Sequence, residues 1–206
     1  STIIIALILQ YLFVFYENKT INNNLFNSSF LIGILAIIYP PFLLLSLFLF
    51  ISYSSVNKLT VRHISIIIIA SFLPLFYVFL FSSLTNNTDV IPLIFNLEFT
   101  TPTFNWKTIV LAIMIITISI YGYSIAIGKR SATDTVSLRI TKAMFYLLIF
   151  SIIIAVFNIL TNAFDGVFII IAIPSAILIA AFFMNSSSIK KEILFVLLLF
   201  FCVFYR

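Results

Sequence analysis

Charged residues are scarce in this chain. Asp, Glu, Lys and Arg make up 8% of its 206 residues, whereas soluble domains contain about 25%. The few charges stand in short breaks between long runs of Ile, Leu, Phe and Val, and such runs are typical of transmembrane helices. A hydrophobic content of 63% is also too high for the polar residues to cover in water. The sequence therefore predicts an all-α fold, a polytopic transmembrane bundle of about six to eight helical segments.

Cysteine and histidine are each present once, as Cys202 and His63. A single cysteine excludes an intramolecular disulfide, and a single histidine cannot build a metal cage. His63 is predicted to be a solvated loop residue. Walker, Rossmann, HExxH, GxSxG and CxxC patterns are all absent from the sequence, so we expect no cofactor and lean against an enzyme.

The net charge is +5, but the basic residues stand in ones and twos at the ends of apolar runs. Positive-inside topology explains this placement better than phosphate binding does, so the expected partners are membrane lipids and other membrane subunits, without nucleic acid.

The organisation of the chain indicates one transmembrane domain over residues 1–206, because no linker rich in Gly, Pro or Ser divides it. The first apolar run, 2–16, has no basic residue before it and no cleavage pattern after it, so it is not a signal peptide. That run and the last one, 193–205, would reach only about 20 to 22 Å as helices, short of the roughly 30 Å hydrocarbon core. We therefore expect the chain to be a fragment of a longer protein, truncated at its N-terminal side.

Four apolar runs are long enough to cross a membrane: 64–84, 108–127, 143–160 and 167–184. Lys and Arg occur in alternate breaks, which fixes the orientation. The breaks predicted to be cytoplasmic are loops 54–63, 128–142 and 185–192. Loops 85–106 and 161–166 hold Asp89, Glu98 and Asp165 without any Lys or Arg, and are predicted to be extracytoplasmic.

The segment 25–53 is interrupted by Tyr39-Pro40-Pro41. Two successive prolines remove two backbone donors and prevent a regular helix at this point. One interpretation is a single long kinked span. The other, which we favour, is a re-entrant hairpin that descends over 28–38 and returns over 42–53. The preceding Asn-rich stretch, 21–24, is predicted to be a short loop.

The four predicted spans contain no ionisable residue in their interior, which lowers the expectation of a proton relay, an ion pathway or a voltage sensor. Their small polar residues are expected to form hydrogen bonds between helices or to lie at the interface. These residues include Ser71, Thr117, Ser119, Ser124, Ser151 and Asn158.

Two features within the spans are open to more than one interpretation. Gly122, between two tyrosines, would soften its helix, let a neighbouring helix approach closely, or belong to an aromatic belt, and we favour the belt. Pro74 and Pro174 lie mid-span and would kink their helices, but the two segments show no matching symmetry that would indicate a transporter.

The Lys and Arg residues between the apolar runs form the candidate site. Cations on two of the predicted cytoplasmic loops would contact the phosphate of an anionic headgroup or of a lipid-linked substrate, or they would serve as a topology signal alone. The candidate residues are Lys58, Arg62, Lys129, Arg130, Arg139 and Lys142.

Three stretches carry a resemblance to a known family: 25–41 (LFNSSFLIGILAIIYPP), 170–175 (IIAIPS) and 191–194 (KEIL). They resemble a domain-of-unknown-function family of polytopic inner-membrane proteins from Bacteroidetes. The resemblance implies a bacterial inner-membrane location and a longer amino end, and it brings no known activity. Stretch 25–41 is also similar to a segment of GT-C class membrane glycosyltransferases. Those enzymes use an acidic residue in an early outer loop, whereas the outer acids here stand alone and late in the chain.

Three functional hypotheses follow. The first is a non-catalytic scaffold or accessory subunit of the inner membrane. The second is the body of a lipid-linked glycosyltransferase of GT-C type that lacks its catalytic loop. The third is a lipid or small-solute transporter, which requires a continuous cavity lined by Ser71, Thr117, Ser151 and Asn158.

Overall fold

The structure of the chain, a computed structural model, describes residues 2–17, 21–55, 60–85, 106–129, 135–161 and 168–204. Within these residues all regular secondary structure is helical, which confirms the all-α class. The elements are α1 (Thr2–Glu17), α2 (Ile21–Ile38), the 3₁₀-helix η1 (Pro40–Leu43), α3 (Leu44–Ser54), α4 (Val61–Leu84), α6 (Trp106–Lys129), α7 (Thr135–Thr161), α8 (Phe168–Asn185) and α9 (Ser188–Phe204).

Three of the four predicted spans lie in helices that are long and apolar enough to cross a membrane. The apolar parts of these helices are Val61–Leu84, Ile109–Gly128 and Ser137–Thr161. The fourth predicted span, 167–184, lies in α8, whose described apolar part, Ile170–Asn185, is shorter. The three long helices support a membrane protein.

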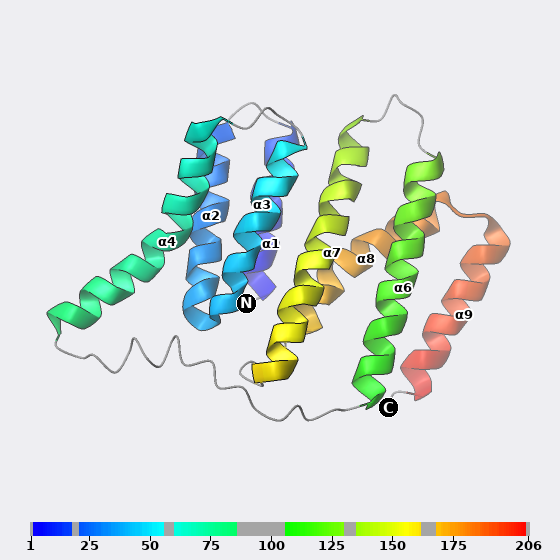
Figure 1. The fold of residues 1–206 in the computed structure, drawn as a ribbon. Helices are drawn as coiled ribbons and strands as arrows, with labels where there is room; N and C mark the ends of the chain where they lie inside the picture. Colours follow the sequence, from blue (N-terminus) through cyan, green and yellow to red (C-terminus); the bar gives the residue numbers. More distant parts are fainter. Residues whose placement is uncertain are drawn as a thin grey trace.

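The chain reverses direction at Tyr39-Pro40-Pro41. Tyr39 has extended backbone (φ −151°, ψ 107°), because a following proline disfavours the helical conformation. The two prolines then begin η1, where a missing backbone N–H interrupts no helical hydrogen bond. Figure 1 shows α2 running down to this break and α3 running back up from it. The segment is therefore a hairpin, and the interpretation of one kinked span is wrong.

The descending half of the hairpin is longer than predicted. Helix α2 begins at Ile21 and has 18 residues, which corresponds to a rise of about 27 Å. The asparagines at 22–24, predicted to form a loop, lie in its first turn. Asparagine side chains are well suited to helix amino ends, where backbone N–H groups lack partners within the helix.

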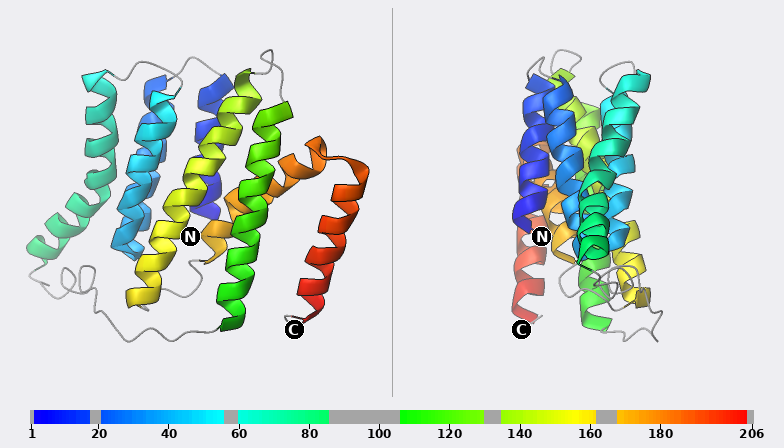
Figure 2. Two further views of the ribbon diagram at one scale, coloured as in Figure 1. Left: turned by 45° about the vertical axis from the view of Figure 1, so that its right-hand side comes forward. Right: turned by 90° about the vertical axis from the view of Figure 1, so that its left-hand side faces the viewer.

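The helices form a flat array, wide in one view and narrow after a quarter turn (Figures 1 and 2). Helix α4 lies at one edge of the array and α9 at the other, while α1 and α8 lie behind α3 and α7. Helices α2, α4 and α7 begin at the upper end in Figure 1, where α3 and α6 terminate. We call this the basic end, for the side chains described below.

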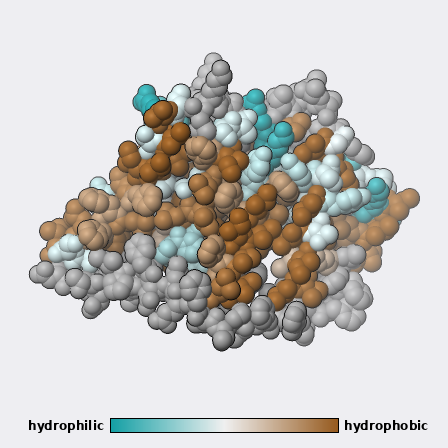
Figure 3. Space-filling model, viewed as in Figure 1, coloured by the Kyte–Doolittle hydropathy of each residue, from teal (hydrophilic) through white to brown (hydrophobic). Residues whose placement is uncertain are grey.

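The core lies where α1, α2, α3 and α7 meet, and α8 extends it. Aliphatic and aromatic side chains form this core, and Phe48 of α3 packs edge-on against Phe150 of α7 with ring centroids 6.5 Å apart. Several serines and threonines are also buried among the described residues. Apolar side chains also cover most of the outer face between its two ends (Figure 3). A surface of this kind is suited to hydrocarbon rather than water.

Two glycines lie where neighbouring helices make close contacts. A Cβ atom on Gly33 of α2 would collide with the backbone carbonyl of Ser71 in α4 and would lie 2.8 Å from Pro74. A Cβ atom on Gly122 of α6 would lie 2.5 Å from the carbonyl oxygen of Leu178 in α8. Small residues at such crossings let two backbones pack directly in a membrane. Close approach, the less favoured interpretation of Gly122, is therefore the one that the structure shows.

Candidate functional site

Four of the six candidate cations, Arg62, Lys129, Arg139 and Lys142, lie on helices rather than in the loops predicted for them. Arg62 is the second residue of α4, and Arg139 and Lys142 lie in the first turns of α7, which begins at Thr135. The loop boundaries predicted at 54–63 and 128–142 are therefore too wide. Lys and Arg are good helix formers, and their long side chains reach past a helix end, so they do not terminate a span.

Three of the six candidate cations have described side chains. Arg62 and Lys142 are exposed, and Arg139 is half-buried. All three lie toward the basic end, but the end of α3 stands between the starts of α4 and α7 (Figures 1 and 2). The structure thus brings them to one end without gathering them in one cluster. Lys129 ends α6, although its side chain is not described, and Lys58 and Arg130 lie outside the described residues.

His63 caps α4 instead of lying in a solvated loop. The Thr60 backbone N–H donates to His63 Nδ1 at 3.4 Å, and the Thr60 hydroxyl lies 2.7 Å from the same nitrogen. The imidazole ring also packs against the Tyr53 ring at the end of α3, with centroids 4.9 Å apart. His63 thus fixes the start of α4 against the end of α3, which explains why the helix begins earlier than predicted.

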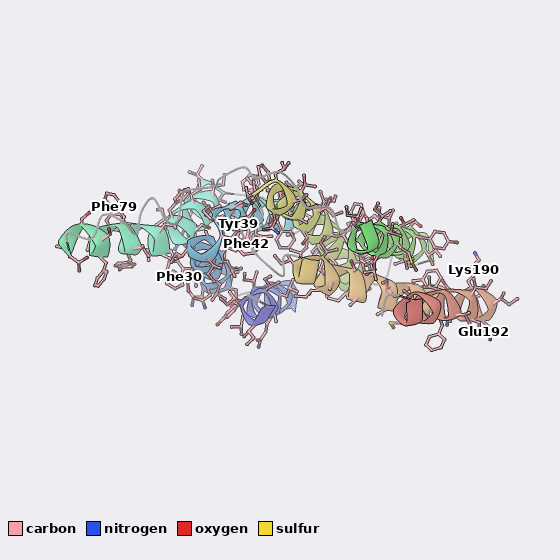
Figure 4. The ribbon with its side chains drawn as sticks, turned by 90° about the horizontal axis from the view of Figure 1, so that it is seen from below. Phe30, Tyr39, Phe42, Phe79, Lys190 and Glu192 are labelled. Atoms are coloured by element: carbon pink, nitrogen blue, oxygen red, sulfur yellow. The ribbon has the colours of Figure 1, made fainter. Side chains whose placement is uncertain are left out.

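Tyr39 ties the proline break to the far end of α7. Its hydroxyl lies 3.1 Å from Thr161 Oγ1, and both side chains are buried. Its ring meets that of Phe42 edge-on at 5.5 Å, and Figure 4 shows the two labelled side chains close together at the tip of the hairpin. The predicted structural break is therefore an anchored turn that is held to another helix.

Most hydroxyls within the spans bond to their own helix. Ser119 donates to the Ile115 carbonyl, Ser151 to the Leu147 carbonyl and Thr117 to the Ile113 carbonyl, at 2.7 to 2.8 Å. The described hydrogen bonds of these three residues therefore lie within one helix rather than between helices. A serine or threonine in a helix reaches the carbonyl one turn back at no cost in chain entropy, and this local bond competes with partners on other helices.

The polar residues that would line a transport cavity point in different directions. Thr117 is exposed on the outside of α6, whereas Ser71, Ser151 and Asn158 are buried in α4 and α7. The described residues also contain no group of three or more His, Cys, Asp or Glu that could hold a metal ion.

No protein-family model matches the chain, and neither a curated protein nor a solved structure does so. The described part of the chain is helical, and three of its helices are long and apolar enough to cross a membrane.

Proposed function

We propose that the chain is a polytopic integral protein of the bacterial inner membrane that serves as a non-catalytic scaffold or accessory subunit. The observation that carries this proposal is the position of α9. This helix makes at most isolated contacts with the other described helices, yet Ile193, Phe195 and Val196 are apolar and exposed on it. A hydrophobic helix held away from its own bundle offers a side-on surface to another membrane subunit.

The distal half of α4 offers a second such surface at the opposite edge. After Pro74 the helix bends away from the array, and Phe79 lies at its outer edge in Figure 4. Phe76, Tyr77, Phe79 and Phe81 are all exposed, although they point in different directions around the helix. Two apolar arms at opposite edges are features that a scaffold would use to join neighbours.

In the proposed orientation the basic end faces the cytoplasm. Positive residues are enriched on cytoplasmic sides, and Arg62, Arg139 and Lys142 belong to this end. The α2–α3 hairpin then enters and leaves from the cytoplasmic side. The Bacteroidetes family resemblance supports the inner-membrane location, and the GT-C likeness stays a prediction about a longer chain.

A crosslinking experiment tests the scaffold role. With the photoreactive residue p-benzoylphenylalanine at Phe195 of α9, we expect one discrete protein adduct in native membranes, visible as a single shifted band. The matched control places the same residue at Phe157, which is exposed on the packed helix α7 and is expected to face lipid. Lipid adducts alone at both positions would contradict a partner at α9.

Single-cysteine labelling tests the orientation. In a Cys202→Ser background, we expect Ser55→Cys, Ser131→Cys and Ser187→Cys to react only with a reagent that reaches the cytoplasm, because the positive-inside rule places their segments there. Asn87→Cys should react with an impermeant reagent added from outside. Labelling of Asn87→Cys and Ser131→Cys from the same side would show that the proposed threading is wrong.

A further inference from the structure

Helix α7 presents a continuous open stripe that begins with two cations at the basic end (Figure 1). Its members follow one another at intervals of three or four residues, which places them on one face of the helix. In chain order they are Arg139, Lys142, Tyr146, Ile149, Ile153, Val156 and Leu160. Arg139 and Tyr146 are half-buried, and the other five are exposed. The buried side chains Met144, Leu147 and Ser151 lie on the opposite face, so the stripe is the outer side of α7.

The two cations have no described carboxylate beside them. Arg139 and Lys142 are separated by about 4.5 Å of helix rise and lie on the same face. Helices α3, α6, α7 and α8 contain no Asp or Glu. Glu17 is the last residue of α1, which lies behind α3 and α7, on the side away from the stripe (Figures 1 and 2). A pair of cations in such surroundings favours an anionic ligand.

Aromatic rings lie where the stripe changes from charged to apolar. Tyr146 follows Lys142 by one turn, and side chains on a helix lean toward its amino end, which brings Tyr146 toward the two cations. Its neighbour Phe145 stacks on Tyr123 of α6, with ring centroids 4.0 Å apart and the planes 8° from parallel. Tyrosines concentrate at headgroup depth in membrane proteins. The boundary between headgroups and hydrocarbon is therefore expected near Tyr146.

The apolar part of the stripe has the length of one membrane leaflet. From Ile149 to Leu160 the helix rises about 16 Å, and half of a typical hydrocarbon core is about 15 Å. The four apolar side chains on this part are 37% to 52% exposed. A charged head followed by an apolar stripe of this length matches the shape of a phospholipid, whereas a free phosphate would use only the head.

We propose that the outer face of α7 binds one anionic phospholipid in the cytoplasmic leaflet. Arg139 and Lys142 hold the phosphate, and the Tyr146 hydroxyl donates to the same headgroup. An acyl chain lies along the apolar part of the stripe, from Ile149 to Leu160. This inference rests on the proposed orientation, which places the basic end in the cytoplasm. It assigns a shared ligand to the two candidate cations of α7 and none to Arg62.

Native mass spectrometry of the purified full chain with phosphatidylglycerol tests the site. We expect one lipid to be retained per chain, and Lys142→Gln to lower the bound fraction about fivefold, the effect of one basic residue near an anionic surface. Lys142→Arg, which keeps the charge, should retain the lipid as the wild type does. Tyr146→Phe removes only the hydroxyl, so it should lower retention by less than Lys142→Gln.

Arg62→Gln is the matched control. It removes the same charge from an exposed side chain at the same end of the array, on α4 instead of α7, and should leave retention unchanged. Equal losses in Lys142→Gln and Arg62→Gln, or equal retention of phosphatidylcholine, would overturn the site. Displacement of the lipid by millimolar glycerol 3-phosphate would also overturn it, because a soluble phosphate would then be sufficient. Should Lys142→Gln fail to fold, Arg139→Gln and Tyr146→Phe provide the same comparison.

Carbonate extraction of membranes separates this inference from the proposed function. We expect wild type and all variants to stay in the membrane pellet. Release of the wild type by carbonate would overturn the integral membrane assignment itself, whereas a wild type that stays in the pellet but retains no phosphatidylglycerol would overturn only the site.

Discussion

Replacing Gly33 with alanine is expected to destabilise the bundle by about 1–3 kcal/mol, the usual cost of overpacking a tight contact. The added methyl would collide with the Ser71 carbonyl, which is backbone and cannot rotate away. Alanine has the higher helix propensity, by about 1 kcal/mol, so any net loss understates the steric effect. Unfolding in mixed micelles with increasing dodecyl sulfate, followed by far-UV circular dichroism, measures the change.

Gly128 provides the matched control for this experiment. A Cβ atom there would meet nothing within 4 Å, so Gly128→Ala should leave stability unchanged or raise it slightly. Gly122→Ala should behave like Gly33→Ala, because its methyl would meet the Leu178 carbonyl. Equal effects of alanine at positions 33 and 128 would show that α2 and α4 do not pack as described.

Phe48→Ala is expected to cost about 2 kcal/mol or more. In water-soluble cores this truncation costs about 3–5 kcal/mol, part of which is transfer from water and is absent in a bilayer. The remaining part is the free-energy cost of the cavity that the truncation leaves between α3 and α7, where Phe48 is fully buried against Phe150. Unfolding in mixed micelles with dodecyl sulfate, followed by far-UV circular dichroism, would measure this loss of stability.

Leu47, next to Phe48 in α3, provides the matched control for Phe48→Ala. Leu47 is 52% exposed, so Leu47→Ala should change the free energy of unfolding by no more than about 0.5 kcal/mol. A larger loss from Leu47→Ala than from Phe48→Ala would mean that the face of α3 assigned to the core is wrong.

The sequence predicted the helical class and the hairpin because both depend on local physics. Long apolar runs without interior charge can satisfy their backbone only as helices in lipid. Pro40 and Pro41 stop α2 whatever surrounds them, and the chain turns back at that point. Features of this kind are determined within a few residues of the position in question.

Helix starts and partners could not be predicted in the same way. The apolar run 143–160 places the start of α7 near residue 143, but the helix begins at Thr135 and includes Arg139 and Lys142. A charged residue predicts the end of an apolar span, but the helix itself continues beyond the apolar layer when the next residues favour helix. The contact of Gly33 with Ser71 joins residues from two helices, so only the packed structure shows that this glycine has no room for a side chain.

The candidate site could also be predicted from the sequence only in part. Arg62 could be singled out from the sequence because basic residues are rare in this chain. Its place in the first turn of α4 could not, because the start of that helix depends on the cap formed by Thr60 and His63.

The bend of α4 at Pro74 has a consequence for the membrane around the protein. A straight helix of its 24 residues would be about 36 Å long, more than the roughly 30 Å of a typical hydrocarbon core. The bend in Figure 1 tilts the distal half and so shortens the height that the helix must cross. A change in the bend angle would match α4 to thinner or thicker bilayers at a cost of fractions of a kcal/mol per Å. The edge of the array that carries the aromatic arm is thus the part best able to follow local bilayer thickness.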